Sequence, residues 1–447
     1  MHPCWENLRF SKFIPFVVAF VATAVCSTAV RADALAKLEP KKLAAVRRSV
    51  QDLRADWQAL PRPGPYREHR ANLHVHSHWS HDSRGTIDEI VAAAKVVGTS
   101  VLMFNEHPAE HYDFFQQGHQ GIKDGVLLIP GAESQGFLAF PMMSLREVQP
   151  ATPQEFSDLV RGRGGLMFVS HLEERMEWNV RGVTGVEIYN THADFKDEKK
   201  MIAALRNPLW LLRTTELVRK YPQESFSALQ DYPSDYLKRW DELCATAPHT
   251  GVSANDAHQN VGLIVRWVAD DKARVEDALG KLLVELDVAA LPDSAGLRQG
   301  KQVGDVLFRF QLDLYEMSLR HVGTHLLLAE LSEKAVREAL AAGRAFVAFD
   351  WLADSTGFDF AAVTDARRYE MGSQLALSRG LSLRGQAPLP VHWRLVHNGK
   401  VVDESAGRSC VFPVVAPGNY RAEAWLEIAG ERMIWILSNP LYIAPLK

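Results

Sequence analysis

The sequence predicts an α/β fold, a barrel of parallel strands followed by a C-terminal β-sandwich. From Ala71 onward, short apolar runs alternate with amphipathic helices, which is typical of parallel strands joined by crossover helices. Five of these runs end on residues that can bind a metal. After Gly343, apolar and polar residues alternate, which indicates β-strands. We therefore expect four segments: a signal peptide at 1–32, a helix and linker at 33–66, the barrel at 67–342 and the sandwich at 343–447.

The N-terminus has the pattern of a secretory signal peptide. Arg9 and Lys12 precede an apolar run from Phe13 to Val25, and small residues lead to a cleavage site near Ala32. The run is short for a membrane span. We expect a periplasmic or secreted protein without stable membrane insertion after cleavage, and an uncleaved N-terminal anchor is the alternative.

Composition and charge are those of an ordinary soluble chain. The 447 residues are 47% hydrophobic and 23% charged. Without residues 1–32 the chain has 47 Lys and Arg against 53 Asp and Glu, a net charge of about −6. This balance and the lack of a basic tract exclude a duplex nucleic-acid partner. Of four cysteines, Cys244 and Cys410 remain after cleavage, and their spacing predicts neither a disulfide framework nor a CxxC site.

Two predicted crossover helices are marked by their caps. Thr86 and Glu89 have the spacing of a capping box, and Gly98 ends the same helix. Thr152 and Glu155 repeat the pattern at the next helix.

The C-terminal strands are marked by turns. Asn398-Gly399 predicts one hairpin and Ala429-Gly430 another. Tryptophans 393, 425 and 435 fall on these strands, where a core position is more common than a ligand platform.

The predicted strand ends carry the chemistry. His74 and His76 lie two residues apart on one strand, so both imidazoles point to the same face. The other runs end in Asn105-Glu106-His107, Gly131-Ala132-Glu133, Ser170-His171 and Asn255-Asp256-Ala257-His258. The carboxyl ends of parallel strands open onto one mouth, where these groups converge.

Imidazoles gathered with Asp and Glu are a donor set for zinc, manganese or iron. A bound ion lowers the pKa of its water to about 7 and polarises a phosphoryl oxygen, so the pattern predicts hydrolysis by a metal-bound hydroxide. An isolated HxH pair would be weak evidence, since surface histidines occur at this spacing by chance.

The ordered motifs resemble those of the polymerase and histidinol phosphatase (PHP) superfamily over about residues 70–260. The resemblance implies a distorted (β/α)7 barrel that holds two or three divalent ions, Zn, Mn or Fe. It implies one site from His74, His76, Glu133 and Asp256, and a second in which Glu133 bridges to His171. It implies a third site from Asp82, His107 and His258. The matching motifs are Leu73-His74-Val75-His76-Ser77, Ser80-His81-Asp82-Ser83, Asn105-Glu106-His107, Gly131-Ala132-Glu133, Ser170-His171 and Asn255-Asp256-Ala257-His258.

The sequence departs from the family pattern at one place. The family usually has a further histidine between the bridging glutamate and the fourth motif, but residues 134–170 contain none. The second ion then lacks a ligand unless His192 or a water supplies it, so fewer than three ions is an alternative. His81 competes with Asp82 for the same role, and we favour Asp82.

Four further residues have weaker assignments. Arg84 and Arg175 are predicted to bind substrate, because a guanidinium matches phosphate oxygens; a surface ion pair is the alternative for each. Glu187 follows a similar strand and either orients metal ligands or forms hydrogen bonds in the interior. His325 has no neighbouring motif and is interpreted as structural.

The predicted function is hydrolysis of a small-molecule phosphoester, with Asp82, His107 and Asp256 as catalytic residues. The alternatives are a metal-dependent hydrolase of a C–N or C–O bond and a non-catalytic periplasmic binding or scaffold protein. The long segment between His192 and Trp240 either forms a lid or packs on the side of the barrel. The sequence leaves oligomeric state, substrate and the choice between monoester and diester open.

Overall fold

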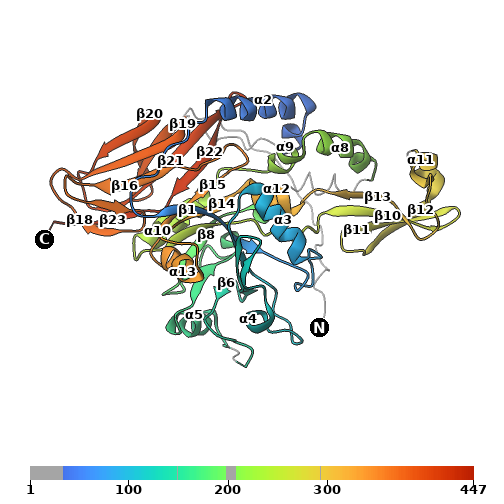
Figure 1. The fold of residues 1–447 in the computed structure, drawn as a ribbon, viewed down its shortest axis with the longest axis horizontal. Helices are drawn as coiled ribbons and strands as arrows, with labels where there is room; N and C mark the ends of the chain where they lie inside the picture. Colours follow the sequence, from blue (N-terminus) through green and yellow to red (C-terminus); the bar gives the residue numbers. More distant parts are fainter. Residues whose placement is uncertain (1–33, 148–149, 198–207, 292, 447) are drawn as a thin grey trace, which may run out of the picture. The chain divides into compact units, whose positions relative to one another are not determined.

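The computed structural model describes residues 34–147, 150–197, 208–291 and 293–446. The predicted signal peptide lies outside them. The described α-helices, several of which flank the strands in Figure 1, are α1 Ala34–Lys37, α2 Pro40–Asp56, α3 Ile87–Val97, α4 Phe114–Gln117, α5 Pro153–Gly162, α6 Thr191–Asp197, α8 Pro208–Lys220, α9 Pro222–Ser227, α10 Ser234–Cys244, α11 Ser294–Arg298, α12 Tyr315–His321 and α13 Glu333–Ala341.

The largest sheet has 14 strands and joins the first strand to the C-terminal region. Strands β1, β2 and β4 pair in parallel, whereas β14 pairs antiparallel with both β1 and β15. The sheet continues from β15 to β22 (Figure 1). Its members are β1 Arg67–Val75, β2 Val101–Phe104, β3 Gly121–Lys123, β4 Val126–Ile129, β14 Gly323–Leu328, β15 Ala345–Ala348, β16 Asp359–Val363, β17 Arg368–Glu370, β18 Gln374–Ala376, β19 Ser382–His397, β20 Lys400–Pro413, β21 Gly418–Ile428, β22 Glu431–Ser438 and β23 Leu441–Ala444.

A second sheet completes the surroundings of the predicted site. Strands β7, β8 and β9 pair in parallel. Single-residue bridges from Val75 to Ala257 and from Glu106 to Ala132 link this sheet to the ends of β1 and β2. The carboxyl ends of strands from both sheets therefore meet. The strands are β5 Ala132–Ser134, β6 Phe137–Phe140, β7 Leu166–Val169, β8 Gly185–Asn190 and β9 Thr250–Ala254.

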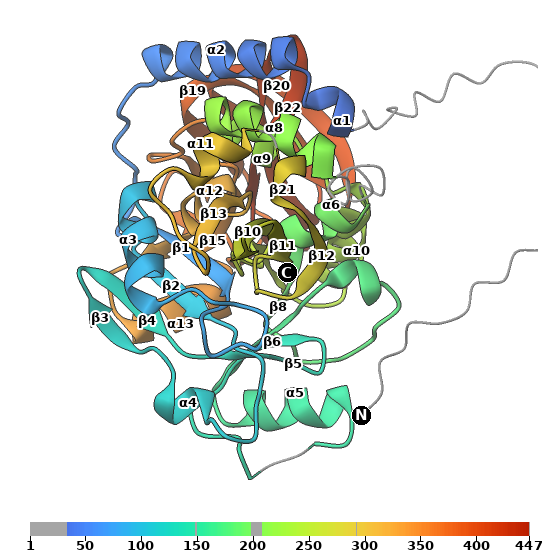
Figure 2. The same ribbon diagram turned by 90° about the vertical axis from the view of Figure 1, so that its right-hand side faces the viewer.

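A third, four-stranded antiparallel sheet lies in the chain between β9 and α12. It contains β10 Gly262–Ala269, β11 Lys272–Asp277, β12 Leu282–Asp287 and β13 Val306–Gln311. Figure 2 shows this sheet with α8 and α9 of the preceding insertion. No motif in the sequence predicts this sheet.

The helix-capping and turn residues identified in the sequence adopt the structures predicted for them. The Thr86 side chain accepts a hydrogen bond from the Glu89 amide, and the Glu89 side chain accepts from the Thr86 amide, so the capping box of α3 is confirmed. Gly98 ends that helix with φ 77°, a left-handed conformation that glycine adopts at low cost. Thr152 caps α5. Asn398 and Gly399 join β19 to β20 with positive φ, as the hairpin prediction requires.

The mixed α/β class is confirmed, and the finer architecture is less regular than expected. The described strands form open sheets rather than a closed barrel, so the distorted (β/α)7 barrel and the separate β-sandwich stay predictions. Residues 33–447 form one compact unit. Strand β14 pairs with β15, and β15 pairs with β22. One sheet therefore runs across the expected domain boundary at residues 342 and 343.

The C-terminal strands contribute to the largest hydrophobic core. Trp393 and Trp435 are fully buried there and Trp425 is 8% exposed, in agreement with the core interpretation. Cys244 and Cys410 are buried free thiols. Among the described helices, none combines the length and apolar character needed to cross a membrane.

Candidate metal centre

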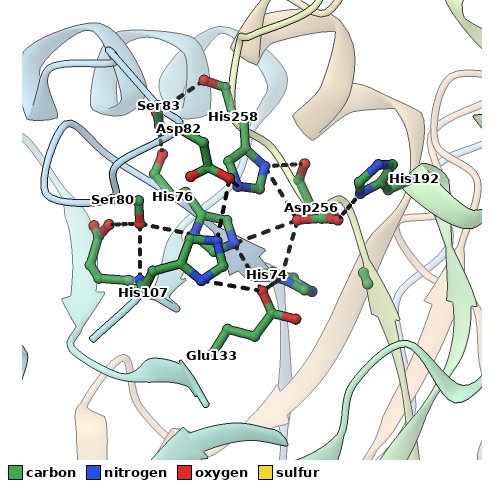
Figure 3. A network of polar contacts seen from close by, with 12 residues as sticks. His74, His76, Ser80, Asp82, Ser83, His107, Glu133, His192, Asp256 and His258 are labelled. Atoms are coloured by element: carbon green, nitrogen blue, oxygen red, sulfur yellow. Dashed lines mark hydrogen bonds and ion pairs between the residues drawn. The ribbon is translucent and has the colours of Figure 1, made fainter. Parts of the chain in front are cut away.

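The end of β1 presents His74 and His76 to a buried cluster of ligand atoms. Both side chains are inaccessible to solvent. The Nε2 atom of His74 lies 3.3 Å from Glu133 Oε2 and 3.2 Å from Asp256 Oδ1. The corresponding distances from His76 Nε2 are 3.7 and 3.5 Å. Figure 3 shows these four side chains pointing toward one another, the two histidines from the end of β1 and the two acidic residues from other parts of the chain.

This first group fits a divalent cation. Ligands about 2.1 Å from a tetrahedral zinc lie roughly 3.4 Å from one another, and the four N–O distances between 3.2 and 3.7 Å agree with that spacing. Within the described ranges, His76 Nε2 and Asp256 Oδ1 are buried without a hydrogen-bond partner. A buried polar atom is costly when unpaired, so a shared cation would satisfy both.

A second group lies on the other side of Asp256. His171 Nε2 is 3.5 Å from Asp256 Oδ2 and 3.1 Å from Glu133 Oε1. His192 Nδ1 is 2.6 Å from Asp256 Oδ2. The structure thus brings His192, weighed as the missing ligand, together with His171 and Asp256. Glu133 and Asp256 therefore each face both groups of imidazoles.

The third predicted set also meets in the structure. Asp82 Oδ2 lies 3.5 Å from His107 Nε2 and 3.4 Å from His258 Nε2. His107, His258 and His76 form another cation-compatible group. His81 is 3.9 Å from Asp82 and its side chain is 79% exposed, whereas that of Asp82 is 30% exposed. Asp82 is therefore the more enclosed of the two competing residues.

Backbone conformation helps to place two of these ligands. His171 has φ 45° and Asp256 has φ 49°, and each follows a parallel strand. Left-handed conformations are uncommon outside glycine, and such strain persists where the surroundings fix it. At these strand ends it turns the chain while the side chains stay in the cluster.

The electrostatics of the cluster couple its histidines to its carboxylates. Burial lowers the pKa of His76 to about 3, and the neighbouring His258 adds to this effect. Burial also opposes protonation of His171, but hydrogen bonds to Glu133 and Glu173 raise its pKa to about 10. For Glu133, burial raises the pKa, yet the neighbouring histidines outweigh it and hold the pKa far below its usual range. The carboxylate is therefore ionised at neutral pH.

Glu187 orients ligands from within the protein. Its Oε1 atom accepts a hydrogen bond from His74 Nδ1 at 2.7 Å, and its Oε2 atom accepts from the His171 amide at 2.7 Å. Glu187 is fully buried. The contact leaves Nε2 of His74 facing Glu133 and Asp256, which is the orienting role considered for this residue.

A second orienting pair, Ser80 and Glu106, was not singled out from the sequence. Ser80 Oγ donates to Glu106 at 2.6 Å and lies 3.0 Å from His76 Nδ1. The same oxygen accepts the His107 amide. The adjacent motifs contained both residues, but neither motif indicated that their side chains meet.

The two predicted substrate-binding arginines lie outside the cluster. Arg175 donates to the carbonyl oxygens of Ser170 and His171, so it braces the loop that carries His171. Arg84 is exposed and donates to the carbonyl oxygen of Leu279. Their roles toward a substrate stay predictions.

Comparisons with known proteins add little. No protein-family model and no curated protein matches the chain. A crystal structure of a two-domain protein containing a predicted PHP-like metal-dependent phosphoesterase from Bacteroides vulgatus is similar at 13% identity and a TM-score of 0.35. The similarity covers 86% of this chain and 98% of that one. A likeness at this level decides neither fold nor activity.

Proposed function

We propose that the protein is a metal-dependent phosphoesterase of the PHP superfamily, a phosphatase or phosphodiesterase acting on a small molecule. One observation carries the proposal: buried imidazole nitrogens and carboxylate oxygens from separate strand ends form overlapping groups whose ligand atoms lie within 4.8 Å of one another. Zinc, manganese and iron prefer such donors. The ordered motifs that resemble the superfamily support the same assignment.

The overlapping groups offer places for two or three ions. His74, His76, Glu133 and Asp256 would hold one, and His171 and His192 would hold a second together with Asp256. Asp82, His107 and His258 would contribute to a third. A divalent cation lowers the pKa of bound water and stabilises negative charge on a phosphoryl oxygen.

The side chains of the protein position the reacting groups and assist proton transfer. In hydrolysis, the water oxygen bonds to phosphorus, the ester P–O bond breaks, and a proton passes to the leaving oxygen. Burial raises the pKa of Asp82, but His107 and His258 outweigh it and keep that pKa below its usual range, so the carboxylate is ionised at neutral pH and can accept a hydrogen bond from the attacking water. His107 is partly exposed beside it and relays the proton. Asp256 anchors the surrounding histidines.

The proposed function includes export of the protein and its division into domains. Cleavage near Ala32 would release the protein to the periplasm or the exterior, with the PHP-like barrel at 67–342 and a sandwich at 343–447. The apolar run before the cleavage site supports export.

The test is turnover of p-nitrophenyl phosphate, bis(p-nitrophenyl) phosphate, p-nitrophenyl acetate and an acyl p-nitroanilide, with zinc, manganese or iron and with EDTA. We expect a phosphoester to be hydrolysed, EDTA to abolish the activity, and His74→Ala to lower kcat/KM by more than about 100-fold. Turnover of the acetate or anilide alone would instead favour C–O or C–N hydrolysis. If the protein turns over none of these substrates but binds a partner without metal, a non-catalytic scaffold function would be favoured.

A further inference from the structure

A small apolar cavity adjoins the metal-binding cluster. Its volume is about 130 Å³, and its lining includes Asp82, His192, Asp256 and His258 of the cluster. The apolar wall is formed by Phe195, Phe226, Leu229, Val261 and Leu312. The cavity is therefore continuous with the residues assigned to the reaction.

The wall is held in place by the packing around it. Phe226 and Leu229 are only 5% and 2% exposed. The Leu312 amide donates to the carbonyl oxygen of Val261, and Asp313 accepts the Val261 amide. Phe195 and Val261 pack against the cluster that contains Leu229 and Leu312. A wall fixed by these contacts is preformed rather than assembled by the ligand.

The charge of the lining restricts what enters. Asp82, Asp256 and Asp313 lie on the cavity, and among the described residues that line it none is lysine or arginine. The lining histidines His192 and His258 already lie against Asp256. A second phosphate, a sulfate or a carboxylate held at the apolar wall would therefore meet no lysine or arginine within the described lining. Burial of such an unpaired charge is strongly unfavourable.

We propose that this cavity holds the ester substituent of the substrate, and that the substituent is a single uncharged ring. The inference rests on the phosphoesterase function proposed above. An engineered apolar cavity of about 150 Å³ binds one benzene molecule, so a volume of about 130 Å³ matches a single ring better than a nucleoside. The ring lies against Phe226 and Leu229, and its ester oxygen lies toward Asp82 and His258.

Hydrolysis of such an ester needs water as its one co-substrate. The oxygen of water forms a bond to phosphorus, and the bond between phosphorus and the substituent oxygen breaks with its electron pair on that oxygen. A proton of the water ends on the same oxygen. The products are the free alcohol of the ring and a phosphate.

The first experiment measures the cavity without the chemistry. Benzyl alcohol is added to the metal-free full chain and followed by ligand-observed NMR. We expect binding by the natural protein and by the control Val402→Phe, whose site is 53% exposed on β20. Val261→Phe fills the cavity and should abolish binding. Failure of benzyl alcohol to bind, or equal binding by Val261→Phe, overturns the inference.

The second experiment compares benzyl phosphate with methyl phosphate in the manganese-loaded protein, and the matching methyl diesters in parallel. Both leaving groups are primary alcohols, so the ratio of kcat/KM reports recognition of the ring. We expect a preference of at least about 10-fold, since one methylene in an apolar pocket gives 10- to 200-fold. Val261→Phe should bring the ratio near one, and Phe195→Ala should extend turnover to 1-naphthylmethyl phosphate.

The outcomes separate the inference from the function on which it rests. Equal turnover of benzyl and methyl phosphate, or preference for phosphocholine or glycerol bisphosphate, overturns the ring assignment and leaves the phosphoesterase standing. Turnover of benzyl acetate but of no phosphate ester, with the benzyl preference lost in Val261→Phe, overturns the phosphoesterase and supports the cavity assignment. Circular dichroism of each variant confirms that the fold is intact.

Discussion

Asp256 is the residue on which the separate ligand groups depend. Its Oδ1 atom faces His74, His76 and His258, and its Oδ2 atom faces His171 and His192. The residue follows β9 with a left-handed backbone, which Asp tolerates better than most residues. One carboxylate therefore joins ligands at the ends of β1, β7 and β9 and at the start of α6.

Replacement of Asp256 by asparagine tests this position. Asp256→Asn keeps the size of the side chain but removes its charge, so we expect the bound metal to fall by at least one ion per chain. Elemental analysis after dialysis measures the content, and circular dichroism checks the fold. The exposed control Asp403→Asn should keep the natural content. An unchanged content in Asp256→Asn would contradict the assigned metal centre.

Glu187 acts through its neighbours rather than by contact with an ion. Its carboxylate fixes the His74 ring and the His171 amide. We expect Glu187→Gln to weaken metal affinity about 10- to 100-fold, the range found when an outer partner of a ligand is removed. Competition with a fluorescent chelator measures the affinity, and Glu177→Gln on the exposed surface is the matched control. Equal affinities in the two variants would refute the orienting role.

Helix α3 shows how local sequence signals build the frame of the site. The capping box begins the helix, and Ile90, Val91 and Ala94 pack in a core with Val75 from β1 and Tyr315 from α12. Tyr315 in turn donates to the His76 carbonyl oxygen at 2.8 Å. Stability of the helix is thereby linked to the strand end that carries two ligands.

Loss of the cap should cost a measurable part of the stability. Thr86→Ala removes the side-chain acceptor for the Glu89 amide, so we expect the free energy of unfolding to fall by about 1 kcal/mol. Urea unfolding followed by circular dichroism measures this change. The exposed Thr356→Ala should change it by less than about 0.5 kcal/mol. If both variants lose the same amount, the cap makes no special contribution.

The sequence predicts the features of the molecule that depend on short spacings along the chain. The period of two placed His74 and His76 on one face, and turn residues marked α3 and the β19–β20 hairpin. The convergence of ligands from distant strand ends was predicted, whereas the order in which distant strands pair was not. No local sequence pattern indicates that β15 pairs with β22 or that the Ser80 side chain donates a hydrogen bond to Glu106. The inserted sheet of β10 to β13 was also not predicted, although β10 pairs with β11 and β11 with β12 as neighbours in the chain.

His325 is one such long-range junction. Its Nδ1 atom lies 2.7 Å from Glu68 of β1, and its Nε2 atom lies 2.8 Å from Asp350 in the loop after β15. Arg70 and Ser355 also contact Asp350. The interpretation of His325 as structural agrees with this place, since it joins the first strand to the C-terminal third of the chain.

This junction predicts a pH dependence of stability. Burial lowers the pKa of His325, but Asp350 and Glu68 outweigh it and raise the pKa from 6.5 to about 9. A raised pKa stabilises the folded state fully below pH 6.5, and the gain disappears as pH rises through 9. The metal-loaded protein should therefore lose up to about 3 kcal/mol relative to His325→Gln between pH 6 and pH 10. Urea unfolding across that range measures both proteins, and parallel curves would show that His325 carries no proton in the folded state.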